Sequence, residues 1–92
     1  MSQTGQSNSS VMAKDMIRIV LADDHNLVRA GIRELLEKLS NVTVVAETAN
    51  GREALAAVEK YQPNLALLDI TMPGLNGLDA AQQMAKRFPG TR

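Results

Sequence analysis

Apolar residues along the chain occur in two alternating patterns, which together predict three repeats of a strand followed by a helix. Short, almost entirely apolar runs are typical of buried strands, and they occupy residues 17–22, 42–46 and 65–68. After each run, apolar residues recur every three or four positions, as on one face of a helix, over residues 26–39, 50–61 and 78–88. Strands joined through helices pair in parallel, so we expect an α/β doubly wound sheet. Its functional groups should lie outside the carboxyl ends of the strands.

Capping residues and apolar spacing define the expected helix ends and buried faces. Asn26 is the expected N-cap of the first helix, and Asn50 with Glu53 three residues later resembles a capping box. We expect each helix to bury one apolar stripe. The stripes are Val28, Ile32, Leu35 and Leu39 in the first helix, Ala54, Leu55, Val58 and Tyr61 in the second, and Leu78, Ala81, Ala85 and Phe88 in the third.

The composition fits one small globular domain. The 92 residues are 45% hydrophobic and 22% charged, and the polar residues 1–15 predict a flexible tail before a domain over residues 16–92. Ten basic residues balance ten acidic ones, so we expect no direct nucleic-acid binding. The absence of cysteine excludes disulfides and thiolate metal sites. No apolar run approaches the ~18 residues of a membrane span, so we expect no membrane contact and a cytoplasmic location.

Three aspartates follow strands of the predicted sheet. Asp23 and Asp24 come directly after the first strand, and Asp69 comes directly after the third. If those strands are neighbours, about 4.8 Å apart, their carboxylates crowd together and must bind protons or a cation. An aspartate pair can also cap the next helix, and Asp69 can form a turn. The joint placement favours a cation site, and oxygen ligands favour Mg²⁺.

The same segments resemble the receiver domain of two-component response regulators. The residues that carry the resemblance are IVLADDH at 19–25, NG at 50–51 and LALLDITMPGLNG at 65–77. DDHNLVRAGIRELL at 23–36 is similar to the NarL/LuxR-type subfamily, whose receivers precede a helix-turn-helix transcriptional output domain. The resemblance implies a flavodoxin-like (CheY-like) sheet with strand order 2-1-3 for the three units present.

The resemblance also implies a role for each residue of the acidic cluster. Asp69 would be the phospho-acceptor, which takes a phosphoryl group from a sensor histidine kinase as an acyl phosphate. Asp24 would bind Mg²⁺ directly and Asp23 mainly through water. Asp69 and the backbone carbonyl of Thr71 would complete the protein ligands.

Neighbouring residues are expected to serve structure rather than chemistry. His25 should form local hydrogen bonds rather than bind a metal. Met72 should pack, Pro73 should stiffen the loop, and Gly74 and Gly77 should allow backbone turns.

A receiver has five strand-helix units, and this sequence carries three. The sequence ends at Thr91 and Arg92, where we expect a fourth strand to begin. It would then lack the Ser or Thr and the Lys that contact the phosphoryl group in the family. The third strand, residues 65–68, would become an edge of the sheet, so we expect a homodimer through that edge.

Two other functions remain open for this sequence. An aspartyl-phosphate phosphohydrolase commonly carries a second acid two residues after the nucleophile, where Thr71 stands. A non-phosphorylated protein-interaction module would make no use of the three aspartates. A nucleotide or flavin binder is disfavoured, because no glycine-rich phosphate loop follows the first strand. We therefore expect a signalling module rather than an enzyme.

Overall fold

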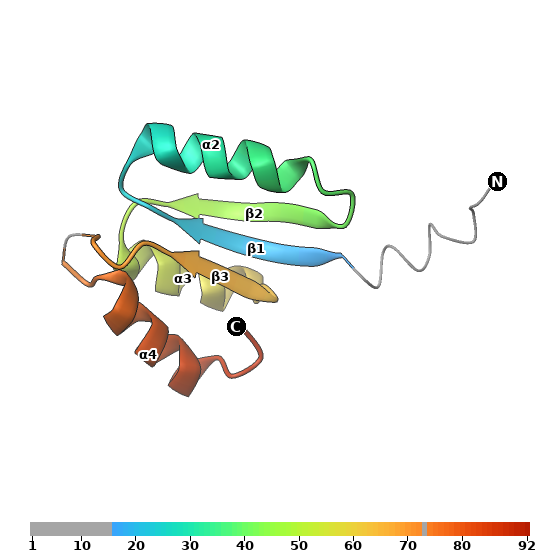
Figure 1. The fold of residues 1–92 in the computed structure, drawn as a ribbon. Helices are drawn as coiled ribbons and strands as arrows, with labels where there is room; N and C mark the ends of the chain where they lie inside the picture. The colour runs from blue at the N-terminus through green and yellow to red at the C-terminus, as the bar shows by residue number, and fades with distance from the viewer. Residues whose placement is uncertain (1–15, 73) are drawn as a thin grey trace.

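The computed structural model describes residues 16–72 and 74–92, in which three strands alternate with three helices (Figure 1). In chain order the elements are β1 (Ile17–Ala22), α2 (Asn26–Glu37), β2 (Val42–Thr48), α3 (Gly51–Tyr61), β3 (Leu65–Leu68) and α4 (Gly77–Arg87). The parallel strands form one sheet in the order β2-β1-β3, which confirms the predicted order 2-1-3. The predicted tail at residues 1–15 and the predicted role of Pro73 lie outside the described residues.

β1 is the central strand and sets the level at which the sheet ends. Its last residue, Ala22, pairs with Thr48 of β2 on one side and with Leu68 of β3 on the other. β2 runs two residues beyond the predicted 42–46, because Glu47 and Thr48 continue the pairing with β1. The residues that follow β1 and β3 therefore leave the sheet side by side.

The main hydrophobic core lies on the face of the sheet that α3 and α4 cover (Figure 1). Its buried members are Val20, Ala22, Ala54, Leu55, Ala57, Val58, Met72, Ala80 and Met84. Ala54, Leu55 and Val58 are buried, as predicted for the second helix, and Met72 packs as predicted. Most of the chain's apolar burial is thus concentrated on one face.

The buried face of α4 differs from the predicted one. Gly77, Ala80 and Met84 are buried, whereas Leu78, Ala81 and Ala85 are exposed and Phe88 is half-buried. The helix begins at Gly77 with Asn76 as its N-cap, and Gly77 packs against the backbone of Asp69. That close contact turns the side of α4 with Gly77, Ala80 and Met84 toward the core. The predicted stripe is therefore wrong at Leu78, Ala81 and Ala85, whereas Phe88 does pack against the core.

Helix α2 covers the opposite face of the sheet and contains no buried residue. Ile32 and Leu36 are half-buried. Val28, Leu35 and Leu39 are 51%, 65% and 53% exposed, so the predicted buried stripe is correct only at Ile32. Within residues 16–72 and 74–92, α2 packs mainly against β2 and β1, which cover a single line of the helix.

The helix starts agree with the sequence at α3 but not at α2. The Asn50 side-chain oxygen accepts the N–H of Glu53 at 2.9 Å, as a capping box requires. The Glu53 carboxylate accepts the N–H of Ala49 at 3.1 Å. His25, rather than the predicted Asn26, is the N-cap of α2, and α2 ends at Glu37 instead of residue 39.

None of the described helices is long and apolar enough to cross a membrane.

The outer edge of β3 is partly paired by the last residue of the sequence. The Arg92 N–H donates to the Asn64 carbonyl at 3.0 Å, and the Arg92 carbonyl accepts the Ala66 N–H at 2.7 Å. Alternation along a strand directs the backbone groups of Leu68 to this same edge. Among the described residues, this edge is therefore paired at its start, and no neighbouring strand pairs with it beyond Ala66.

Candidate functional site

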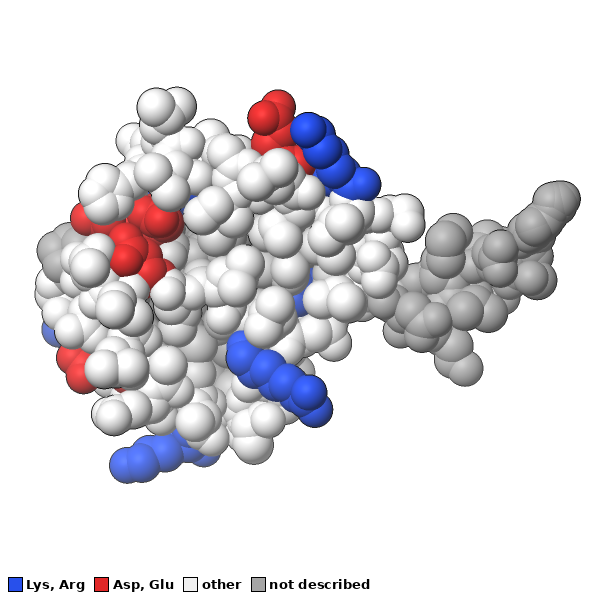
Figure 2. Space-filling model, viewed as in Figure 1, with Lys and Arg blue, Asp and Glu red and all other residues white. Residues whose placement is uncertain are grey.

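The sheet register places the predicted acids together. Asp23 directly follows Ala22, Asp69 directly follows Leu68, and those two strand ends are paired. Asp69 donates its N–H to the Ala22 carbonyl at 2.9 Å, which ties the two exits to each other. Acidic atoms gather at this end of the molecule, beyond the strand ends (Figure 2). The predicted meeting of Asp23, Asp24 and Asp69 is confirmed.

The imidazole of His25 lies within this group of carboxylates. Its Nδ1 is 3.1 Å from an oxygen of Asp23, 3.1 Å from an oxygen of Asp24 and 3.7 Å from an oxygen of Asp69. One potential ligand atom from each of the four residues lies within 4.8 Å of all the others. The Asp23 and Asp69 side chains are only 10% and 18% exposed, whereas His25 is 63% exposed. His25 thus occupies the mouth of a pocket whose acids lie deeper.

Local hydrogen bonds explain why His25 lies there. Its backbone N–H donates to the Asp23 carboxylate at 2.8 Å, and its ring contacts the same carboxylate oxygen. This is the local hydrogen-bonding role that the sequence predicts. The hydrogen bond to Asp23, followed by the charge of Asp24, raises the pKa of His25 above its ordinary value of 6.5. An imidazolium in this position partly neutralises the acids, as a bound cation would.

The two oxygens of the Asp69 carboxylate have different surroundings. Oδ1 accepts the Thr71 N–H at 2.9 Å and the Thr71 hydroxyl at 2.8 Å. These bonds, the backbone one first, lower the pKa of Asp69 below its ordinary value of 3.8. Oδ2 faces His25 instead. Thr71 therefore lies beside Asp69 as expected, while the proposed role of its carbonyl as a metal ligand stays a prediction.

Gly77 fixes the loop that carries Asp69. A Cβ at this position would collide with the backbone carbonyl of Asp69 and crowd Ile70. Only glycine allows the start of α4 to approach the end of β3 so closely. Gly74, in the same loop, has a φ of +70°, in the region that favours glycine. Both glycines serve backbone geometry, as the sequence predicts.

Arg29 of α2 makes a contact at this site that the sequence motifs do not predict. Its Nη1 donates to the backbone carbonyl of Asp23 at 2.6 Å. Its Nε donates to the Glu47 carboxylate of β2 at 3.2 Å. The sequence indicates this contact only weakly: Arg29 lies three residues before Ile32, on the helix face next to that half-buried side chain. Nothing in the sequence pattern couples that arginine to Asp23 or Glu47.

The donor set fits a hard divalent cation. Three carboxylates with clustered oxygen atoms supply the ligands that Mg²⁺ prefers. An apolar cavity of about 260 Å³, lined by Ile32, Leu21 and Leu67, lies under α2 and reaches Asp23 and Asp69. Apolar walls lower the local dielectric constant and so strengthen charge interactions at the acids.

Comparisons with known proteins agree with this geometry. The response regulator receiver domain family matches residues 19–92. The transcriptional regulatory protein DegU of Brevibacillus brevis is 38% identical over 79 residues, which cover 86% of this chain and 34% of the relative. The nitrate/nitrite response regulator protein NarL of Escherichia coli K12 is 38% identical over 69 residues, which cover 75% and 32%. The chain thus spans about a third of the length of these relatives.

Solved structures show the same fold. The receiver domain of a NarL response regulator from Mycobacterium tuberculosis has a TM-score of 0.81 and 36% identity, covering 85% of this chain and 63% of that one. A LuxR-family response regulator from Aurantimonas sp. SI85-9A1 has a TM-score of 0.80 and 35% identity, covering 84% and 55%. These neighbours and the 2-1-3 strand order confirm the flavodoxin-like fold. The chain belongs to the response regulator receiver domain family, in its NarL/LuxR-type branch.

Proposed function

We propose that this chain is a phospho-accepting receiver module, which takes a phosphoryl group from a sensor histidine kinase onto Asp69 in the presence of Mg²⁺. The observation that carries the proposal is the asymmetric environment of the Asp69 carboxylate. Thr71 holds Oδ1 with two hydrogen bonds, while Oδ2 faces the cluster of Asp23, Asp24 and His25. One oxygen is thereby anchored, and the other is available as a nucleophile.

The reaction would transfer a phosphoryl group from the kinase histidine to Asp69. Asp69 Oδ2 would attack the phosphorus, the oxygen–phosphorus bond would form, and the nitrogen–phosphorus bond to the kinase histidine would break. The lowered pKa keeps Asp69 ionised at neutral pH, so no base is needed to activate it. Asp24, Asp69 and the Thr71 carbonyl would hold Mg²⁺ directly, and Asp23 mainly through water. The ion, when bound, would neutralise charge on the phosphoryl oxygens.

Control of a helix-turn-helix output domain and a cytoplasmic location are parts of the same proposal. Both are supported by the resemblance to NarL/LuxR-type regulators. The chain has no net charge, so recognition of DNA is assigned to an output domain rather than to this module. The position of Thr71 supports a signalling module over an aspartyl-phosphate phosphohydrolase. Thr71 carries a hydroxyl, hydrogen-bonded to Asp69, where a phosphohydrolase commonly carries a second carboxylic acid.

Labelling with a small phosphodonor tests this proposal. With acetyl phosphate and Mg²⁺, mass spectrometry of the 92-residue chain should show one phosphoryl adduct, on Asp69. Asp69→Asn should lose the adduct. Asp79→Asn, which changes an exposed aspartate in the first turn of α4, should keep it. An undiminished adduct in Asp69→Asn would contradict the assignment of the acceptor.

We also propose that a second copy of the chain pairs with the open part of the β3 edge. Arg92 pairs with the edge as far as Ala66, and the backbone groups of Leu68 lie beyond it. An open, apolar strand edge favours pairing with another strand. Sedimentation velocity over a concentration series should show a monomer–dimer equilibrium. A compact monomer at every concentration would exclude the dimer.

A further inference from the structure

We propose that Arg29 is a positioning residue for the acidic pocket: its guanidinium fixes the turn on which Asp23 and Asp24 lie. The inference rests on the proposed function, since a fixed pair of carboxylates matters only if the pocket holds a cation. It goes beyond that function by assigning metal affinity to a residue of α2 outside the ligand set.

The guanidinium joins three separate parts of the structure. Nη1 donates to the Asp23 carbonyl at 2.6 Å, Nη2 donates to the Asn26 side-chain oxygen at 2.9 Å, and Nε donates to Glu47 at 3.2 Å. These acceptors belong to the turn after β1, the first residue of α2, and β2. A planar arginine fork can reach three acceptors in fixed directions, which a lysine ammonium on its flexible stem cannot do. The Arg29 side chain is only 18% exposed.

The contact with the Asp23 carbonyl determines where Asp24 lies. That carbonyl belongs to the peptide that links Asp23 to Asp24, so holding it fixes the plane from which the Asp24 backbone continues. On the other side, the Asp23 N–H donates to the Thr48 carbonyl of β2 at 3.1 Å. The main chain of Asp23 is therefore held at both its donor and its acceptor. Contacts of this kind around a metal site orient the direct ligands and raise affinity.

The ion pair with Glu47 explains how a half-buried arginine can lie next to a cation pocket. An unpaired guanidinium next to Asp23 would repel a divalent cation. Arg29 is instead paired with Glu47, whose other oxygen accepts from Arg33 at 2.7 Å. The charge of Arg29 is thus partly neutralised by a carboxylate outside the cluster of Asp23, Asp24, His25 and Asp69. Its remaining donors serve the turn.

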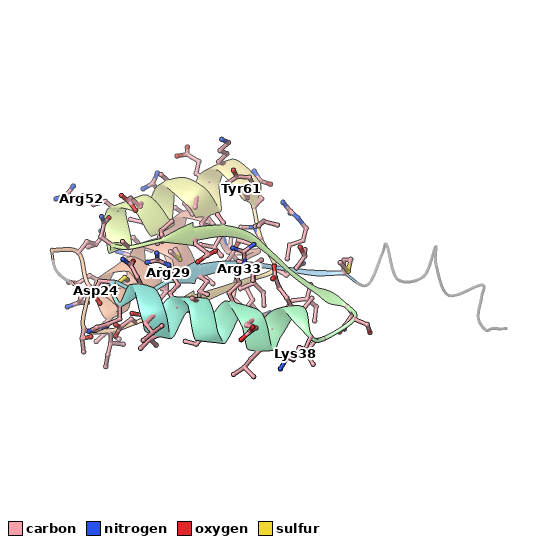
Figure 3. All side chains as sticks on the ribbon, turned by 90° about the horizontal axis from the view of Figure 1, so that it is seen from above. Asp24, Arg29, Arg33, Lys38, Arg52 and Tyr61 are labelled. Atoms are coloured by element: carbon pink, nitrogen blue, oxygen red, sulfur yellow. The ribbon has the colours of Figure 1, made fainter. Side chains whose placement is uncertain are left out.

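Arg33 provides a matched control. It lies one helical turn after Arg29, and both arginines lie along the side of α2 next to β2 in Figure 3. Arg33 bonds Glu47 and, at 3.3 Å, Glu37, and its side chain is 48% exposed. Loss of Arg33 removes a bond between α2 and β2 but leaves the Asp23 carbonyl held. The two substitutions therefore separate the positioning of the turn from attachment of the helix.

The test compares Mg²⁺ affinity in Arg29→Met, Arg29→Lys and Arg33→Met, followed by amide chemical shifts in the 92-residue chain. We expect Arg29→Met to raise the dissociation constant about tenfold, the lower end of the loss for a contact that orients metal ligands. Arg29→Lys should give an intermediate value. Arg33→Met should stay within about twofold of the unchanged protein. Thermal unfolding of each variant supplies the folded fraction by which affinities are corrected.

A second readout without metal keeps this inference separate from the proposed function. In metal-free protein, the amide resonances of Asp23, Asp24 and His25 should broaden or double in Arg29→Met and remain single in Arg33→Met. If the unchanged protein does not bind Mg²⁺, the proposed function fails and these resonances alone decide the role of Arg29. A folded Arg29→Met with unchanged resonances, or with undiminished Mg²⁺ affinity, would overturn the inference.

Discussion

The two faces of the sheet are built on different physical principles. Helices α3 and α4 bury apolar side chains against one face, where Val58 is fully buried. Helix α2 on the other face has no buried residue, and Arg29 and Arg33 attach it to Glu47 of β2. The first face supplies stability through apolar burial. The second face buries fewer apolar side chains, among them Ile19 and Leu21 of β1, and adds directional contacts that reach the acidic pocket.

This difference separates where stability arises from where the chemistry is positioned. Apolar packing is strong and non-directional, whereas a hydrogen-bonded guanidinium defines the placement of a backbone group. Changes on the α3 and α4 face should therefore affect unfolding, and changes near the pocket should affect ionisation and metal binding with smaller effects on stability.

The largest expected effect is on the buried face. Val58→Ala should lower the free energy of unfolding by about 2–3 kcal/mol, because it removes two methyl groups from a closely packed site. Val28→Ala is the matched control, since Val28 on α2 is 51% exposed, and it should change stability by less than about 0.5 kcal/mol. Denaturant unfolding measures both. Equal losses would show that α2 packs as tightly as α3.

A pair of glycine substitutions extends the comparison to backbone packing. Gly77→Ala should destabilise the chain by about 1–2 kcal/mol, because its Cβ would collide with the Asp69 carbonyl. Gly31→Ala in α2 meets nothing within 4 Å and should stabilise by up to about 1 kcal/mol through helix propensity. Thermal unfolding distinguishes the two signs. A neutral Gly77→Ala would mean that the loop carrying Asp69 yields without strain.

The next effect concerns ionisation of Asp69. Thr71→Val removes one of two bonds to its carboxylate, so the pKa of Asp69 should rise part of the way toward 3.8. Thr91→Val is the control, because the Thr91 hydroxyl bonds the Pro63 carbonyl away from the site. A lowered pKa stabilises the fold above about pH 3.8, and that contribution is lost as pH falls through the folded value. Carbon NMR of the carboxyl group measures the shift, and an unchanged pKa in Thr71→Val would contradict it.

The smallest effect concerns His25 at the mouth of the pocket. In metal-free protein its pKa should lie above 6.5, through the hydrogen bond to Asp23 and the charge of Asp24. Because this pKa is raised, the stabilisation is complete below about pH 6.5 and is lost as pH rises through the folded value. Proton NMR of the imidazole follows the titration. Asp24→Asn should lower the pKa, and a His25 that titrates at or below 6.5 in the unchanged chain would disagree with the geometry.

The sequence predicts strands and strand-end acids better than helix faces. The apolar run at residues 65–68 and the aspartates beside it need only local pattern and parallel pairing. The faces of α2 and α4 depend on what packs beside them. Leu35 is exposed because the sheet covers only one line of α2. Ala80 is buried because Gly77 brings α4 against Asp69.

The candidate site shows the same limit. Asp23, Asp24 and Asp69 follow strands and can be placed from the topology, and their neighbour Thr71 can be placed from its position in the chain. The contact between Arg29 and Asp23 is different, because the helix must first take its rotation on the sheet and Glu47 must extend β2. A long, flexible side chain reaches several acceptors, and only the folded arrangement determines which of them it meets.

A titration with Mg²⁺ tests directly whether the acids at the end of the sheet form a cation site. Amide resonances of Asp23, Asp24 and Asp69 should shift saturably in the unchanged chain. Asp24→Asn should weaken binding at least about tenfold, since even contacts around metal ligands contribute 10–100-fold. Glu34→Gln, on an exposed position of α2, should bind Mg²⁺ normally. Equal affinity in Asp24→Asn and the unchanged chain, or shifts confined to residues away from the strand ends, would show that these acids do not form the cation site.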